Sequence, residues 1–243
     1  MCTVIVHVPE TADEPTRILA VRDEDPERAW DPLGTWWPDA YPGVAGVRDA
    51  RAGGAWLAAD PSTRRLAVLL NRADVVTLAE DDLQSRGGVV LEAVAGRGPG
   101  THPPTHGFNL VEVDGARVAV TTWNGAEIRT IELPSGTHMI AHDDVDDHDT
   151  PRIARWLGAF ADAQTDAAAS TPSLEWFAPW LTLLERSAQL SPTDDDAIIR
   201  DNRPLGYPTL SLLLCLASIG PDGIDLAYGA FDEPGRWNGL ALG

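Results

Sequence analysis

Short stretches of alternating hydrophobic and polar residues recur along the chain, and this alternation is typical of half-buried β-strands. Two of them, residues 2–8 (CTVIVHV) and 17–22 (RILAVR), stand close together at the start of the sequence. The segment 9–16 between them is rich in Pro, Glu, Asp and Thr, which favours a turn. The pattern therefore predicts a strand pair that begins at the amino terminus.

Further strands are expected in the middle and at the end of the chain. GAWLAAD (54–60) and RRLAVLLNR (64–72) form a predicted hairpin around a PST turn. By contrast, residues 25–43 hold several prolines and tryptophans, and we predict a long loop there. The remaining predicted strands are 108–113, 117–123, 126–132, 209–219 and 223–230.

Helical patterns occur in three segments, and a stretch rich in Ala, Thr and Ser (162–172) is expected to link two of them. Because strands dominate both ends and the helices cluster, the order predicts an α+β fold of antiparallel sheets covered by helices. We expect a single domain over residues 1–243. The predicted helices are 80–95, one that begins at Asp149 or Thr150 with Pro151 in its first turn, and 173–189.

The charge balance narrows the possible partners. The 243 residues include 37 acidic and 18 basic side chains, which gives a formal net charge of −19. Such a surface repels phosphate, so we expect no nucleic-acid partner. No apolar run reaches the roughly 18 residues of a membrane span, and no signal peptide is recognisable before Pro9. We therefore expect a cytoplasmic protein without a membrane span, and its oligomeric state stays open.

The use of lysine and cysteine excludes several kinds of chemistry. All 18 cations are arginines, which rules out a pyridoxal phosphate Schiff base and a P-loop lysine. The two cysteines, Cys2 and Cys215, form neither a disulfide framework nor a zinc-binding pattern. The acidic stretch 142–149 lacks the glycine and distal glutamate of a calcium loop, so it favours a solvated, helix-capping loop. We expect no metal and no cofactor.

Cys2 is the first candidate for chemistry because it directly follows the initiator methionine. Removal of Met1, which a small second residue normally allows, would place a thiol and a free α-amino group on one residue. The pKa of a thiol is about 8.5 and that of an α-amine about 7.7, so the amine can accept the thiol proton near neutral pH. Cys2 would then be a nucleophile with its own base. Alternatively, Cys2 is only a small residue that suits a strand.

Charged residues at the end of the second predicted strand bear on the same site. In an antiparallel pair, this end lies beside the start of the first strand, so Arg22 and Asp23 are expected near Cys2. Asp23 could hold the α-ammonium group, and Arg22 could lower the pKa of the thiol. The alternative is a solvated charged loop, which is common in so acidic a chain.

Seven short motifs then occur in a recognisable order. They are MCTV (1–4), AVRDE (20–24), WWPD (36–39), AGVRDARAGGAWLA (45–58), LLNR (69–72), SRG (85–87) and FNLVEVDG (108–115). Together they cover about the first half of the chain. In this order they resemble the NRDE family, also described as transport and Golgi organisation proteins, whose members are similar to N-terminal-nucleophile (Ntn) hydrolases.

The resemblance implies a four-layer αββα sandwich, in which two antiparallel sheets lie between helical layers. It also implies functional roles by position. The implied catalytic residues are Cys2 as the nucleophile, Arg22 and Asp23 as the groups that orient and tune it, and Asn71 as an oxyanion donor. The implied substrate-binding residues are Arg48, Trp37, Asn109 and His142.

Three positions depart from the family pattern. The name-giving asparagine is Val21 in this chain. Where the family tends to have a Ser-Asn pair, this chain has Ala141-His142, and His142 could donate in place of the amide. The family often has an arginine between small hydroxyl residues near the end, whereas YPTLSLL (207–213) contains no cation. In the hydrolase relatives, the last two positions would supply an oxyanion donor and a transition-state partner.

Two classes of function follow from these observations. The first is an Ntn-hydrolase-like protein that cleaves an amide or other acyl bond of a small molecule through a thioester on Cys2. The second is a non-catalytic carrier that binds an acyl thioester, a lipid or a haem-like ligand in the same cleft. The nine tryptophans could line an apolar pocket for such a ligand, although tryptophan more often fills a core.

Overall fold

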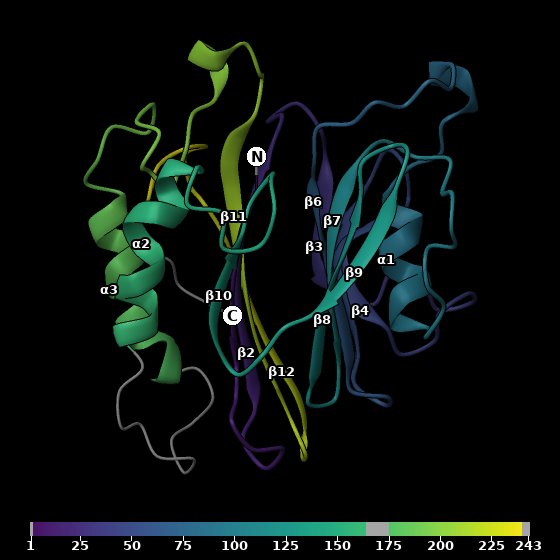
Figure 1. Cartoon of the computed structure of the whole chain (residues 1–243), viewed down its shortest axis with the longest axis horizontal. Coiled ribbons are helices and arrows are strands. Elements are labelled where there is room, and N and C mark those ends of the chain that lie inside the picture. The colour runs from purple at the N-terminus through teal and green to yellow at the C-terminus, as the bar shows by residue number, and fades with distance from the viewer. Residues whose placement is uncertain (1, 164–174, 240–243) are drawn as a thin grey trace. The chain divides into compact units, whose positions relative to one another are not determined.

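The computed structural model describes residues 2–163 and 175–239 and divides into two compact units. Each unit contains one antiparallel sheet with at least one helix packed against it (Figure 1). As far as they are described, the first unit comprises Met1–Glu27, Ser135–Ser218 and Asp225–Gly243, and the second comprises Arg28–Pro134 and Ile219–Ile224.

The sheet of the first unit has five strands in the order β10-β1-β2-β11-β12. Strand β1 pairs antiparallel with β2 and with β10, so that Thr3 lies opposite Val21 and Val4 lies opposite Ile140. The strand pair predicted at the amino terminus is therefore confirmed. The strands are β1 (Thr3–Val8), β2 (Thr16–Glu24), β10 (Gly136–Ile140), β11 (Leu210–Gly220) and β12 (Gly223–Ala230).

Two helices, α2 (Pro151–Asp162) and α3 (Ala178–Ser187), pack against each other, and α2 contacts β10 (Figure 1). A short 3-10 helix, η2 (Glu175–Phe177), precedes α3. Apolar side chains of the helices and of the strands form one buried cluster. Its centre is Trp180, whose ring lies 5.6 Å from that of Phe160 in an edge-on arrangement. This tryptophan therefore fills a core, as tryptophans commonly do.

The sheet of the second unit has seven strands in the order β3-β4-β5-β6-β7-β8-β9, and α1 (Gly87–Val94) packs on β5, β6 and β7. A Cβ atom on Gly54 would lie only 2.6 Å from the carbonyl carbon of Gly87, so the two backbones touch. This contact explains why a glycine begins the helix. The strands are β3 (Trp30–Gly34), β4 (Ala45–Asp49), β5 (Ala55–Asp60), β6 (Arg65–Asn71), β7 (Phe108–Asp114), β8 (Arg117–Trp123) and β9 (Ile128–Glu132).

The α+β class with two antiparallel sheets and helices is confirmed, and it is compatible with the sandwich that the resemblance implies. The single domain over residues 1–243 stays a prediction. The prediction of a long loop over 25–43 is wrong in part, because this segment contains β3. The single helix predicted over 80–95 is also wrong in part, because the segment forms a 3-10 helix, η1 (Glu80–Asp82), and the separate helix α1. Most of the predicted linker 162–172 lies outside the described residues.

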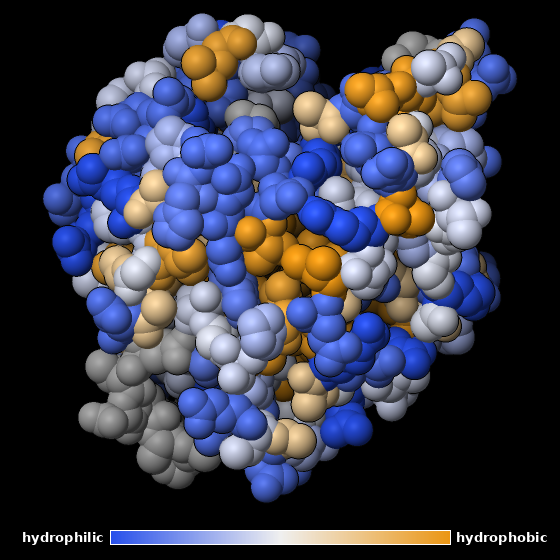
Figure 2. Space-filling view, in the orientation of Figure 1, coloured by the Kyte–Doolittle hydropathy of each residue, from blue (hydrophilic) through white to orange (hydrophobic). Residues whose placement is uncertain are grey.

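The surface and the helices were compared with the polarity expected from the sequence. Hydrophilic residues predominate on the face that Figure 2 shows. Within residues 2–163 and 175–239, every helix is too short or too polar to cross a membrane.

Candidate active site

Cys2 lies immediately before β1, and its thiol contacts the backbone of Asp23. The Asp23 N–H group donates to Sγ of Cys2 over 3.4 Å, and the thiol donates to the Asp23 carbonyl oxygen over 3.6 Å. The strand register explains this contact, because Thr3 pairs with Val21 and the next positions outward are Cys2 and Arg22. The structure thus places Asp23 beside Cys2, where the strand pattern predicted it.

The surroundings of Cys2 favour the neutral thiol. Burial raises its pKa, because the thiolate loses hydration, and the nearby charge of Asp23 acts in the same direction. The Asp23 N–H group and the charge of Arg22 act in the opposite direction. For Cys215 of β11, burial raises the pKa of the thiol to about 12. Both thiols therefore need a base to react.

The Asp23 carboxylate is held by two side chains from a distant part of the chain. Ser211 Oγ donates to Oδ1 over 2.5 Å, and Asn202 Nδ2 lies 3.4 Å from Oδ2. Asn202 also donates to Thr209 Oγ1 over 3.1 Å. Asp23 is only 4% exposed, so the alternative of a solvated loop charge is wrong.

Arg200, a second buried charge of this region, is fully engaged. Its Nε donates to Asn202 Oδ1 over 3.0 Å, which orients the amide toward Asp23. Its Nη1 and Nη2 atoms donate to backbone oxygens and to one carboxylate. These acceptors are the carbonyl oxygens of Asp194, Asp195 and Ala197 and the Oδ1 atom of Asp195.

Arg152, the second residue of α2, is a buried arginine with few partners. It is 1% exposed, and its Nη2 lies 3.3 Å from Nδ1 of His142. Its Nε and Nη1 atoms have no hydrogen-bond partner in the described part of the chain. Burial lowers its pKa to about 10, against the charges of Asp23 and Cys2, so Arg152 stays protonated at neutral pH.

His142 follows β10 and contacts Arg152. Burial, followed by the charge of Arg152, lowers the pKa of His142. Its Nδ1 faces Arg152 and its Nε2 lies 3.0 Å from Oδ2 of Asp143. These partners assign a neutral ring in which Nδ1 accepts and Nε2 carries the proton. Both ring nitrogens are engaged, so His142 orients Arg152, and its role as an oxyanion donor stays a prediction.

The other residues that the motifs implicated lie in the second unit. Asn71 is exposed at the end of β6, and Asn109 of β7 is buried, where it accepts from Thr122 Oγ1 over 3.1 Å. The predicted roles of Asn71 and Asn109 stay predictions, as do those of Arg48 and Trp37. Arg48 Nε donates to Asp31 Oδ2 over 2.6 Å, and Trp37 Nε1 donates to the Gly53 carbonyl oxygen over 2.7 Å.

The sequence reasoning missed Arg152, Asn202 and Ser211. For Arg152 a signal was present, since it stands four residues before Trp156 on α2, and both are buried. An arginine in line with the apolar face of a helix points to an internal role. Asn202 and Ser211 carry no comparable signal, because only the fold brings them to Asp23.

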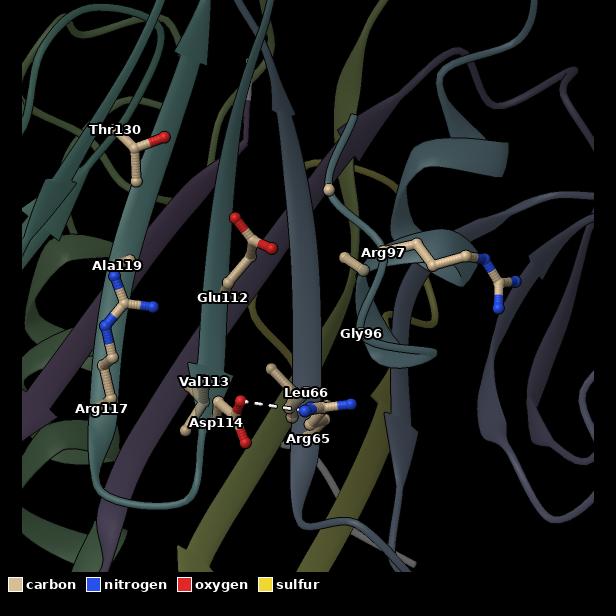
Figure 3. A pocket seen from close by; sticks show the side chains of 12 residues that line it. Arg65, Leu66, Gly96, Arg97, Glu112, Val113, Asp114, Arg117, Ala119 and Thr130 are labelled. Carbon is tan, nitrogen blue, oxygen red and sulfur yellow. Dashed lines mark hydrogen bonds and ion pairs between the residues drawn. The ribbon is translucent and has the colours of Figure 1, made fainter. Parts of the chain in front are cut away.

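A pocket of about 180 Å³ lies in the second unit, where β7 and its neighbours meet the end of α1 (Figure 3). Its arginines are paired with carboxylates. Burial raises the pKa of Glu112, which accepts a hydrogen bond from Thr121 Oγ1 over 2.9 Å. The arginine pairs are Arg65 with Asp114 at 3.2 Å, Arg117 with Glu132 at 2.7 Å, and Arg97 with Glu92.

Metal ligands do not gather anywhere in residues 2–163 and 175–239: no group of three or more His, Cys, Asp or Glu side chains is placed to hold an ion. In the acidic stretch, Asp146 Oδ2 instead lies 2.7 Å from Nδ1 of His138, and Asp146 Oδ1 accepts from the Met139 N–H group over 2.8 Å. These contacts tie the stretch to β10.

The fold and the site define an α+β protein with a buried cysteine and a fixed aspartate next to each other. The family model described as Transport and Golgi organisation 2 matches residues 1–201, which include Cys2, Asp23 and Arg152. The chain therefore belongs to the Transport and Golgi organisation 2 family, the NRDE family that its motifs resemble. A search of curated proteins finds no match.

Proposed function

We propose that the protein is an Ntn-hydrolase-like enzyme in which Cys2 attacks the carbonyl carbon of an amide or other acyl bond. The observation that carries the proposal is the contact of the Cys2 thiol with Asp23, whose carboxylate is fixed by Ser211 and Asn202. A nucleophile whose neighbours are rigidly oriented suits covalent acyl transfer.

The proposed mechanism needs a base, because burial raises the pKa of Cys2. In this mechanism Met1 is removed, the α-amino group of Cys2 accepts the thiol proton, and Asp23 holds the resulting ammonium group. The thiolate adds to the carbonyl, and the tetrahedral intermediate collapses to a thioester. The leaving amine takes the proton from the ammonium group, and water then hydrolyses the thioester to release the acid.

Acetylation by p-nitrophenyl acetate tests this proposal. We expect the folded protein to take an acetyl group on residue 2 and to release p-nitrophenolate, as read by peptide mapping and absorbance. The variant Cys2→Ser should lose the fast reaction, and Cys215→Ala should keep it. Acetylation that is equally fast in Cys2→Ser, or absent from residue 2, would contradict the proposal.

A carrier remains the second candidate because of one observation in the first unit. A pocket of about 370 Å³ there is lined by residues that include the apolar Leu190, Ile199 and Trp237 and the charged Arg236. Its volume lies at the lower end of the range for small-molecule sites, about 300–1,000 Å³. A fluorescent fatty acid that binds equally well to the protein and to Cys2→Ser, while residue 2 resists acetylation, would favour the carrier.

A further inference from the structure

Arg152 and Arg200 are both buried in the first unit, but their surroundings differ. Arg200 has an acceptor for each of its guanidinium nitrogens, whereas Nε and Nη1 of Arg152 have none among the described residues. A buried cation without acceptors is costly, because water no longer solvates it. An anion that binds there would remove this cost.

The first turn of α2 adds to the positive character of this place. Arg152 is the second residue of a 12-residue helix, whose N-terminus carries a partial positive charge. Thr150 precedes the helix, and its buried hydroxyl group has no hydrogen-bond partner in residues 2–163 and 175–239. Asp23, the acid with the largest effect on the pKa of Arg152, is already held by Ser211 and Asn202. Within the described residues, Nε and Nη1 of Arg152 and the hydroxyl group of Thr150 therefore lack a hydrogen-bond partner.

We propose that Arg152 binds a carboxylate group of the ligand on which Cys2 acts. The inference rests on the proposed function for the role of Cys2, and it narrows the substrate to a small acyl compound that bears a carboxylate, such as an acylated amino acid. The single charge of a carboxylate matches one arginine. A doubly charged phosphate would meet the repulsion of Asp23 and of a chain with a net charge of −19.

Paired alkylating reagents test this proposal directly. Iodoacetate and iodoacetamide have nearly the same shape, and each transfers its carbon to a thiolate with loss of iodide, but only iodoacetate carries a carboxylate. Peptide mapping gives the two rate constants at Cys2. We expect the iodoacetate-to-iodoacetamide ratio to be higher in the folded than in the urea-unfolded protein. In Arg152→Gln the ratio should fall by about tenfold, the effect of one charge-assisted hydrogen bond.

Two further variants control this experiment. Arg155→Gln removes the same charge from the same helix, at an exposed arginine paired with Asp196, and should leave the ratio unchanged. Arg152→Lys keeps the charge and should restore part of the ratio. The neutral variant Arg152→Met replaces Arg152→Gln if that variant does not fold. A ratio that is the same with and without the charge at residue 152 overturns the inference.

A measurement that does not depend on the reaction of Cys2 distinguishes failure of the enzyme proposal from failure of the carboxylate site. Sodium acetate, compared with sodium chloride at equal ionic strength, should raise the thermal midpoint of the protein and of Arg155→Gln but not of Arg152→Gln. If Cys2 resists both reagents while acetate still stabilises through Arg152, the enzyme proposal fails and the carboxylate site stands. If acetate has the same effect on all three proteins, the carboxylate site is overturned.

Discussion

Charged side chains cluster in two regions of the molecule. The charges are exposed and paired in one region and buried in the other. In the pocket of the second unit, the arginines are 31% to 58% exposed at their side chains, and carboxylates neutralise them. Around Cys2, by contrast, Asp23, Arg152 and Arg200 are all at most 4% exposed. Exposed ion pairs contribute little to stability, whereas buried charges are costly unless they are satisfied. We therefore expect a ligand where a buried charge is incompletely paired, and the number of charges alone does not indicate such a place.

The largest effect should come from Arg200→Met. The substitution removes the donor to the Asn202 amide oxygen and to three backbone carbonyl oxygens, and it loosens the support of Asp23. We expect the free energy of unfolding to fall by about 3 kcal/mol, because a buried acceptor that loses its donor costs about 1–3 kcal/mol and several acceptors are affected. Urea denaturation measures it. A loss below about 1 kcal/mol would show that the buried contacts of Arg200 are not structural.

Asp23→Asn should affect both stability and reactivity. A buried carboxylate that accepts from Ser211 and Asn202 is lost, so we expect a destabilisation of about 2 kcal/mol. Alkylation of Cys2 by iodoacetamide should slow by about tenfold, because the α-ammonium group loses its partner. Urea denaturation and peptide mapping on the same sample give both values. An unchanged alkylation rate would make Asp23 purely structural.

Arg152→Met should not lower the free energy of unfolding, in contrast to Arg200→Met. The methionine has a similar length and no unsatisfied donors, so the free energy of unfolding should stay the same or rise by about 1 kcal/mol. Denaturation under the conditions used for Arg200→Met makes the comparison direct. A loss as large as that of Arg200→Met would mean that Arg152 is a structural cation, and the contrast between the two arginines would disappear.

The smallest effect is expected in the pocket of the second unit. Burial raises the pKa of Glu112 above its unfolded value, so its contribution to stability is present below about pH 4.5 and is lost as the pH rises through the folded pKa. Glu112→Gln should therefore be slightly more stable at pH 7, by less than about 1 kcal/mol, and equal at pH 4. Thermal midpoints at both pH values measure this difference.

The exposed pair in the same pocket provides the control. Asp114, with a side chain that is 55% exposed, pairs with Arg65, and Asp114→Asn should change stability by no more than about 0.5 kcal/mol. A larger loss would show that the pocket depends on its ion pairs as strongly as the Cys2 region depends on Arg200.

The sequence predicted those parts of the fold and site that depend on neighbouring elements. The alternation in 2–8 and 17–22 predicts β1 and β2, and their antiparallel pairing is enough to bring Asp23 to Cys2. Strand β3 was missed because Pro32 argues against a strand, yet β3 is an edge strand, where proline is tolerated.

The partners of Asp23 could not be predicted, because they come from far along the chain. Ser211 is separated from Asp23 by 188 positions, and Asn202 by 179. No local pattern encodes such a contact, since it depends on β11 lying next to β2 in the sheet. The unsatisfied state of Arg152 is likewise a property of packing, which composition and periodicity do not contain.

Whether the thiol and the α-amine of Cys2 act together is decided by one protein, measured before and after its amino terminus is released. A cleavable extension ahead of Cys2 blocks the α-amino group, and a site-specific protease then frees it. We expect acetylation of residue 2 by p-nitrophenyl acetate to be at least about a hundredfold faster after cleavage, as for a positioned general base. An equal rate before and after cleavage, with Cys2 still the acetylated residue, would contradict the claim that its thiol and α-amine act together.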